Sequence, residues 1–206
     1  MSDIESIMRA GPIIAVLTLD DPSQARALAQ TYVEAGIAGL EVTLRTPRAL
    51  EVMARMAEVD GAVVGAGTVL NRDHLKAAVD HGAQFIVSPG LTSPVAEAAA
   101  SANVAYLPGI ANSGDIMRGL DLGLSHFKFF PAEASGGVKA LSALAAPFAA
   151  CRFCPTGGVN PDNLRTWLDT PGVLCAGGTW LNPKPGEDLA TLGERVASAV
   201  KLARGR

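Results

Sequence analysis

The sequence predicts an α/β protein, a single-domain (β/α)8 TIM barrel with an extra N-terminal helix, over residues 1–206. Three observations support this fold class. Eight short apolar runs recur at nearly even intervals, and segments with helical periodicity and good helix formers separate them. This alternation indicates a parallel sheet with right-handed crossovers. Eight parallel strands are also the number that closes a barrel.

The predicted strands are almost continuously apolar, as expected where a parallel sheet is buried on both faces. They span residues 13–17, 39–43, 63–67, 85–88, 105–107, 126–130, 152–156 and 173–177. An open doubly wound sheet is the competing architecture. It is disfavoured because no run looks like an edge strand with protective charges.

The segments between the strands carry helix start and stop signals. SQARALAQTYVEAG ends in a glycine suited to a C-cap, and TPRALEVMARMAEVDG opens with Thr46–Pro47, a capping threonine followed by proline in the first turn. NRDHLKAAVDHGAQ, SPVAEAAASANV and NPDNLRTWLDTPG repeat the helical pattern. Residues 2–10 are expected to form the extra helix, which closes the bottom of the barrel.

Composition and charge narrow the functional class. Hydrophobic residues make up 49% and charged residues 18%, which excludes a disordered chain. No apolar run approaches the ~20 residues that a membrane-spanning helix needs, and MSDIESIMRAG lacks the basic and apolar parts of a signal peptide. The net charge of -3 provides no general attraction for nucleic acid. We therefore expect a cytoplasmic protein with small-molecule partners, and neither nucleic acid nor membrane.

Neither a cofactor nor a metal is expected. The three histidines occur in no metal-ligand spacing, and His126, on the sixth predicted strand, suits a hydrogen-bonded core position better than a ligand. Cys151 and Cys154 form a C-x-x-C pattern. They fall on a predicted strand, where positions three apart point to opposite faces, so we interpret them as small buried side chains.

The second predicted strand carries charged residues on one face. In GLEVTLRT, Glu41, Thr43 and Arg45 share one parity, and the intervening positions are apolar. Because the apolar set must pack on the helices, the polar set is predicted to face the barrel mouth. Active sites of such barrels lie at the carboxyl ends of the strands.

Lys128 lies on the sixth predicted strand between Phe127 and Phe129, whose parity places them against the helices. The lysine then points into the barrel. Burial disfavours the charged ammonium, and a neutral amine is what a carbonyl nucleophile needs. A buried ion pair of Lys128 with Glu41, without chemistry, is the alternative. It contributes little net stability, so the nearby Arg45 favours a catalytic site.

Glycine-rich turns follow the last two predicted strands. Gly157 and Gly158 come after the seventh, and Gly178 with Thr179 after the eighth. Phosphate sites of this fold use these loops, where glycines let backbone amides approach the anion. GAGT after the third strand lacks the third glycine of a dinucleotide fingerprint, and we expect it to present Thr68 at the mouth.

Seven segments in order resemble the 2-keto-3-deoxy-6-phosphogluconate (KDPG) aldolase family along nearly the whole chain. They are GLEVTLRTP, VGAGTVLN, FIVSPGLT, LPGI, FKFFPAEASGGVKAL, RFCPTGGVNPDN and AGGTWL. The resemblance implies a cofactor-free class I aldolase, a trimeric (β/α)8 barrel. Such an enzyme cleaves a phosphorylated keto sugar acid into pyruvate and glyceraldehyde 3-phosphate, in the Entner-Doudoroff pathway.

The resemblance also implies residue roles. The family's Schiff-base lysine falls on Lys128, and its proton-shuttling glutamate and carboxylate-binding arginine fall on Glu41 and Arg45. Thr68 is similar to the second pyruvate contact. Thr156, in CPTGG, resembles the threonine that influences which aldehyde face is used.

Several alternatives stay open at this point. Galactonate-specific relatives carry EIPLNSP and KIFPS where this chain has EVTLRTP and KFFPA, which favours the gluconate substrate. Cleavage of 4-hydroxy-2-oxoglutarate, a sugar-phosphate isomerase or epimerase, and a non-catalytic barrel are the others. Thr179 replaces the usual serine but keeps a hydroxyl. Glu133, after the sixth strand, could reach the site or cap the following helix, and we expect it to cap.

Overall fold

The computed structural model describes residues 3–205 and has the predicted (β/α)8 architecture. Eight parallel strands follow one another around the sheet in chain order. They are β1 (Ile13–Leu17), β2 (Gly39–Thr43), β3 (Val63–Gly67), β4 (Phe85–Ser88), β5 (Ala105–Ile110), β6 (His126–Phe129), β7 (Arg152–Pro155) and β8 (Ala176–Gly178). β1 pairs with β8, and bridges between the β7 and β8 segments close the barrel.

The first four strands have the predicted bounds, and the last four differ from them. β5 extends to Ile110, and β6 and β7 each end one residue early. The prediction of a strand over 173–177 was wrong, because Val173 forms only a single bridge with Phe153. Between this bridge and the one joining Thr156 to Gly177, the chain advances three residues on one side and four on the other. The extra residue interrupts the ladder as a bulge does.

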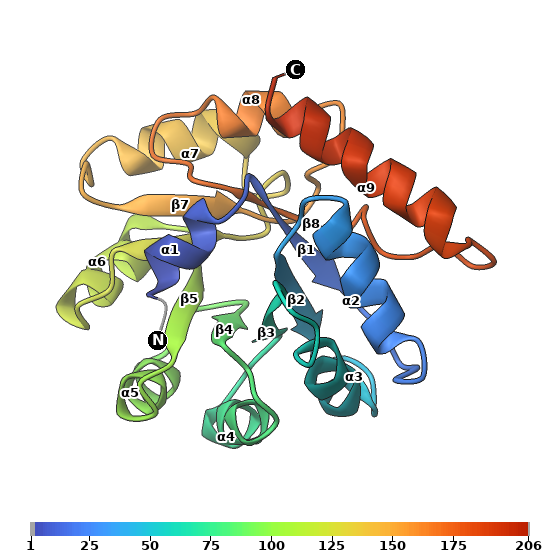
Figure 1. The fold of residues 1–206 in the computed structure, drawn as a ribbon. Coiled ribbons are helices and arrows are strands. Elements are labelled where there is room, and N and C mark those ends of the chain that lie inside the picture. The colour runs from blue at the N-terminus through green and yellow to red at the C-terminus, as the bar shows by residue number, and fades with distance from the viewer. Residues whose placement is uncertain (1–2, 206) are drawn as a thin grey trace.

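An outer ring of helices surrounds the strands (Figure 1). Its members are α2 (Ala25–Glu34), α3 (Ala49–Met56), α4 (Arg72–Asp80), α5 (Ser93–Ser101), α6 (Ser113–Asp121), α7 (Gly137–Ala145), α8 (Leu164–Leu168) and α9 (Leu189–Ala203). Gly36, with φ +96°, follows α2 as predicted. The predicted cap at Thr46 was wrong, because α3 begins at Ala49 and the Thr46 hydroxyl donates to the Leu19 carbonyl instead.

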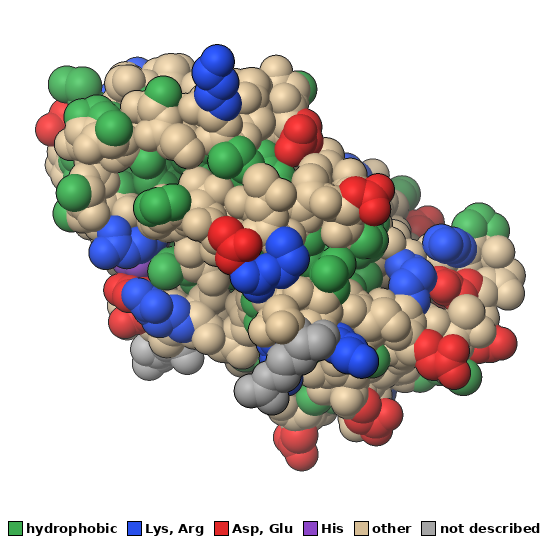
Figure 2. All heavy atoms as spheres, turned by 90° about the horizontal axis from the view of Figure 1, so that it is seen from above, with side chains coloured by type: hydrophobic (Ala, Val, Ile, Leu, Met, Phe, Trp, Pro, Cys, Tyr) green, Lys and Arg blue, Asp and Glu red, His purple; other side chains and the backbone are tan. Residues whose placement is uncertain are grey.

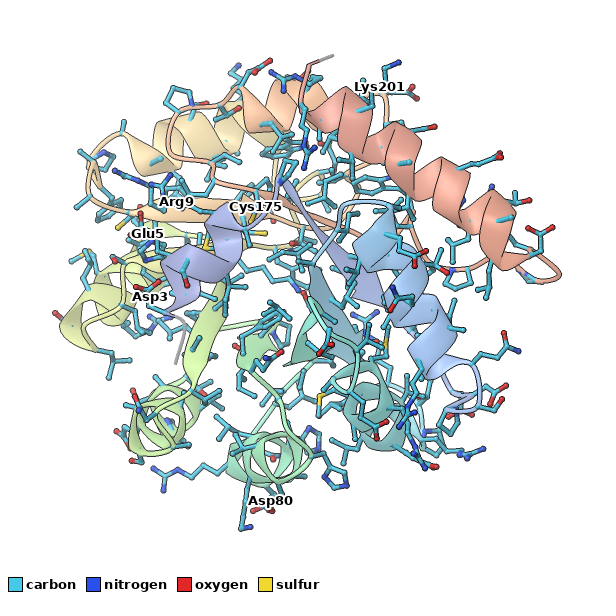
Figure 3. The ribbon with its side chains drawn as sticks, viewed as in Figure 1. Asp3, Glu5, Arg9, Asp80, Cys175 and Lys201 are labelled. Atoms are coloured by element: carbon cyan, nitrogen blue, oxygen red, sulfur yellow. The ribbon has the colours of Figure 1, made fainter. Side chains whose placement is uncertain are left out.

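The predicted extra helix is present as α1 (Ile4–Arg9). Its Ile7 and Met8 are buried in a second apolar cluster that fills the barrel interior. That cluster also contains Ile14, Phe85, Val87, Leu107, Cys154 and Cys175. Figure 3 shows Cys175 beside α1. The helix therefore closes one end of the barrel with apolar side chains and leaves the polar chemistry to the other end.

Strand parity separates the outer core from the interior as predicted. Leu40 and Val42 of β2 and Phe127 and Phe129 of β6 lie in the main cluster beneath the helices. The Phe129 ring is 6.2 Å from that of Trp167 on α8. The intervening side chains of the two strands are thereby directed into the barrel.

The cysteines follow the same rule. Cys151 belongs to the cluster beneath the helices and Cys154 to the interior cluster, so the two thiols of the C-x-x-C pattern point to opposite faces. Both are buried and free. The interpretation as small buried side chains is confirmed.

The surface carries charges of both signs. Figure 2 shows acidic and basic side chains interspersed among apolar ones on the side of the molecule seen from above. Over residues 3–205, no helix has the length and apolar character needed to cross a bilayer.

Candidate active site

The barrel interior contains a charged pair made by Lys128 of β6 and Glu41 of β2. Lys128 Nζ lies 3.1 Å from Glu41 Oε1, and the two residues are only 5% and 3% exposed. The ring centroid of Phe130 is 5.2 Å from the same Nζ, a cation–π contact. The predicted juxtaposition of lysine and glutamate is therefore observed.

Small neighbours leave room for this pair. Lys128 is flanked in the sheet by Gly109 of β5 and Cys154 of β7. A Cβ at Gly67 would overlap the Glu41 carboxylate, so only glycine suits that position. GAGT is thus conformational as well as chemical, because its second glycine accommodates the carboxylate.

A second contact joins Arg45, just after β2, to Thr68, just after β3. The Arg45 Nε donates to the Thr68 hydroxyl over 3.1 Å. Within residues 3–205, Arg45 forms no ion pair with an acidic side chain. Its exposed guanidinium is available for a planar anion such as a carboxylate.

Thr68 has an unusual backbone conformation. Its φ is +59°, in the left-handed region that β-branched residues avoid. Hydrogen bonds on either side hold the turn, from Leu44 N to the Gly67 carbonyl and from Val69 N to the Val87 carbonyl. Backbone strain of about 1–3 kcal/mol tends to accumulate at functional sites, and here it directs the hydroxyl to Arg45.

The two glycine-rich turns lie side by side at the closing seam, since Thr156 bridges to Gly177. Thr156 is 3% exposed, and its hydroxyl occupies the space that a Cβ at Gly177 would need. Gly157 and Gly158 have φ of +98° and +82°. In the described part of the chain, the amides of these two glycines donate no hydrogen bond. They can serve as donors to an anion.

The turn after β8 is shaped by an aromatic ring. A Cβ at Gly178 would overlap the Trp180 indole, which explains the glycine there. Thr179 is exposed at this turn, and its carbonyl accepts from the Asn182 amide nitrogen over 3.0 Å. The predicted phosphate-loop residues therefore lie on two adjacent segments.

The prediction that Glu133 caps α7 was wrong. The N-cap is Gly136, and no side chain caps that helix. The Glu133 carboxylate instead accepts from Trp167 Nε1 at 2.8 Å and from Asn163 Nδ2 at 3.2 Å. Asn163 also donates to the Gly158 carbonyl over 3.0 Å. Glu133 thus braces the first glycine turn, a role that no local sequence signal reveals.

His126 lies below Lys128, near α1. Its Nδ1 is 3.1 Å from the Ser125 hydroxyl, and its Nε2 is 3.4 Å from Glu5 Oε2. Burial lowers the pKa of His126, and the Glu5 carboxylate partly opposes this. Among the described residues, no three His, Cys, Asp or Glu side chains are grouped so that they could hold a metal ion.

Comparisons with known proteins agree with this geometry. Residues 4–194 match the model of the KDPG and KHG aldolase family. The chain is 49% identical to the 2-dehydro-3-deoxy-phosphogluconate aldolase of Zymomonas mobilis, over 98% of this chain and 99% of the relative.

Solved structures are similar along the same length. The aldolase of Zymomonas mobilis ZM4 with 3-phosphoglycerate has a TM-score of 0.94 and 48% identity, covering 97% of this chain and 96% of that one. The KDPG aldolase of Legionella pneumophila, with pyruvate captured as a covalent carbinolamine, has a TM-score of 0.89 and 35% identity, covering 97% and 98%. From its barrel, its interior lysine and these matches, the chain belongs to the KDPG and KHG aldolase family.

Proposed function

We propose that this protein is a class I aldolase that cleaves KDPG into pyruvate and D-glyceraldehyde 3-phosphate. The observation that carries the proposal is the buried 3.1 Å contact between Lys128 and Glu41. A single barrel, residues 1–206, would supply the whole site. The product and substrate chemistry place the reaction in the Entner-Doudoroff pathway.

Lys128 acts as the nucleophile. Transfer of its proton to Glu41 leaves a neutral amine, which attacks the carbon-2 ketone and forms a carbon–nitrogen bond. The carbinolamine then loses water and becomes a protonated imine. The imine nitrogen withdraws electrons from carbon 3 and prepares the bond between carbons 3 and 4 for cleavage.

Glu41 moves the protons. Its carboxylate takes the proton of the carbon-4 hydroxyl, the bond between carbons 3 and 4 breaks, and its electrons form an enamine as the aldehyde leaves. The carboxyl group returns a proton to the enamine carbon, and water hydrolyses the imine to release pyruvate. Proton transfer of this kind contributes about 100- to 10,000-fold to a rate.

Two ends of the substrate are held apart. Arg45 and Thr68 bind the carboxylate, and the guanidinium that is free of acidic partners supports this role. Fixing both ends of a substrate places the ketone against the amine. Amides and hydroxyls of the two turns bind the phosphate, using Gly157, Gly158, Gly178 and Thr179. Thr156, buried between the turns and the amine, faces the aldehyde and influences which face reacts.

Hydride trapping tests the proposal directly. The protein is reduced with borohydride in the presence of pyruvate, digested, and mapped by mass. We expect one pyruvyl adduct at Lys128, none in Lys128→Ala, and an unchanged yield in Lys139→Ala, whose lysine is exposed on α7. An unmodified wild-type protein contradicts the Schiff-base mechanism.

Substrate range is a separate question. The family also includes KHG aldolases, so 4-hydroxy-2-oxoglutarate is the second candidate substrate, and the 6-phosphogalactonate epimer the third. Side-by-side cleavage assays separate the three. A sugar-phosphate isomerase needs no imine, and trapping at Lys128 would rule it out as the sole activity.

We further propose that the protein works in the cytoplasm as a homotrimer, as the family resemblance implies. Light scattering after size-exclusion chromatography tests the assembly. A mass of one chain, 21.1 kDa, would contradict the trimer.

A further inference from the structure

The chain segment after β8 is held from α9 by one arginine. Arg195 Nη1 donates to the Trp180 carbonyl over 2.6 Å, and its Nη2 donates to the Asn182 carbonyl over 2.9 Å. The same guanidinium forms a two-pronged contact with Glu187, from Nε to Oε1 at 2.9 Å and from Nη2 to Oε2 at 2.6 Å. Both side chains are largely buried, at 21% and 6% exposed. Arg195 therefore uses its whole fork on this segment.

Two further side chains complete the anchoring. The Tyr32 hydroxyl, from α2, donates to the Leu181 carbonyl over 2.5 Å. The Asn182 side chain accepts from Thr18 N at 2.7 Å and donates to the Val16 carbonyl at 2.7 Å, which ties the segment to β1. All four carbonyls from Thr179 to Asn182 thus accept hydrogen bonds involving side chains.

The segment so anchored begins at the turn assigned to phosphate binding. We propose that Arg195 is a positioning residue that sets the preference of the enzyme for phosphorylated substrates, an inference that rests on the proposed function. It holds the carbonyls of Trp180 and Asn182 towards α9 and thereby fixes where Gly178 and Thr179 present their donors. Positioning errors of about 1 Å can cost ~100-fold in rate or affinity, so an anchor outside the site is sufficient.

Arg195 does not act as a phosphate ligand itself. Four of its N–H groups are occupied by protein acceptors, and Glu187 neutralises its charge. Hydrogen bonding to Arg195 lowers the pKa of Glu187 to about 2, so this pair stays ionised at any pH at which the enzyme would be assayed. The effect of Arg195 on the phosphate end is therefore geometric.

The test compares a reaction that uses the phosphate with one that does not. Arg195→Met and Arg195→Lys are assayed for KDPG cleavage, for inhibition by inorganic phosphate, and for exchange of the pyruvate methyl protons. We expect KM for KDPG and the inhibition constant of phosphate to rise about 10-fold or more in Arg195→Met, and less in Arg195→Lys. Exchange with pyruvate should stay within about twofold of wild type, because it needs only the other end of the site.

Arg72→Met is the matched control. Arg72 on α4 also donates to a backbone carbonyl, that of Pro94, and to a carboxylate, that of Glu97, but it lies away from the turns. It should change neither reaction. Equal losses of cleavage and pyruvate exchange in Arg195→Met would show a general structural role and overturn the inference, and so would an unchanged KM. A wild-type protein that exchanges no pyruvate protons would overturn the proposed function, and this inference with it.

Discussion

The two halves of the barrel mouth are built in different ways. The half assigned to pyruvate uses charged side chains on strands, with Lys128, Glu41 and Arg45 each projecting from a definite position of β2 or β6 or just beyond. The half assigned to phosphate uses backbone turns whose own side chains are mostly hydrogen atoms. Its shape depends on supports outside the turns, from Glu133 and Arg195. Chemistry is concentrated in a few residues of the first half and distributed around the second.

Replacing the nucleophile should break the first half completely. Lys128→Met removes the amine, so KDPG cleavage should fall by about 10,000-fold or more. It also leaves Glu41 buried without its partner, which costs about 3 kcal/mol of stability. Denaturant titration and the cleavage assay measure the two effects.

A double variant separates catalysis from ion pairing. Lys128→Met combined with Glu41→Gln should regain much of the lost stability, because no buried charge remains, and none of the activity. Activity in either variant would show that the pair is only structural.

Glu41→Gln should interrupt proton transfer and leave imine formation intact. Borohydride trapping with pyruvate should still modify Lys128, and exchange of the pyruvate methyl protons should slow by about 100- to 10,000-fold. Proton NMR in deuterated water follows the exchange. Exchange at the wild-type rate would assign the proton shuttle to another group.

The second half should respond to a single methyl group. In Gly158→Ala, the new Cβ would lie 2.5 Å from Glu133 Cγ at a residue with φ +82°, so the turn must move. We expect KM for KDPG to rise by about 10- to 100-fold with little change in pyruvate exchange. Gly82→Ala is the control, because Gly82 has φ +87° and open space around it. A similar rise in both variants would mean that backbone strain alone is responsible.

The contrast between the halves also explains what the sequence could predict. Period-2 parity placed Glu41 and Lys128 in the interior because apolar neighbours had to face the helices, and the structure agrees. The strands followed from the same pattern, except where the bulge delays β8 to Ala176. Glu133 and Arg195 could not be assigned in this way, because their partners are backbone carbonyls or side chains far away in the chain, which leave no local periodicity.

Arg45→Lys tests whether a forked donor matters. A lysine retains the charge but cannot make the two parallel hydrogen bonds that a guanidinium offers a carboxylate. Pyruvate should bind about 10-fold more weakly, as measured by the concentration dependence of trapping, and inhibition by inorganic phosphate should not change. Weaker phosphate inhibition in this variant would show that the two halves of the mouth are not independent.

The smallest effect is expected at the closed end of the barrel, remote from both halves. Burial, and to a lesser extent Arg152, lower the pKa of His126, while Glu5 and Asp3 raise it. With a depressed pKa in the folded state, the contribution of neutral His126 to stability is complete above the unfolded pKa of 6.5 and decreases as the pH falls below it. His126→Gln should therefore flatten the stability profile between about pH 7.5 and pH 5, and His81→Gln, at an exposed position on the end of α4, should not. Urea titrations across this range measure the profile. Because His126 contacts Glu5 of α1 rather than the mouth, KM for KDPG and pyruvate exchange should both stay at wild-type values at neutral pH, and a change in either would connect the closed end to the site.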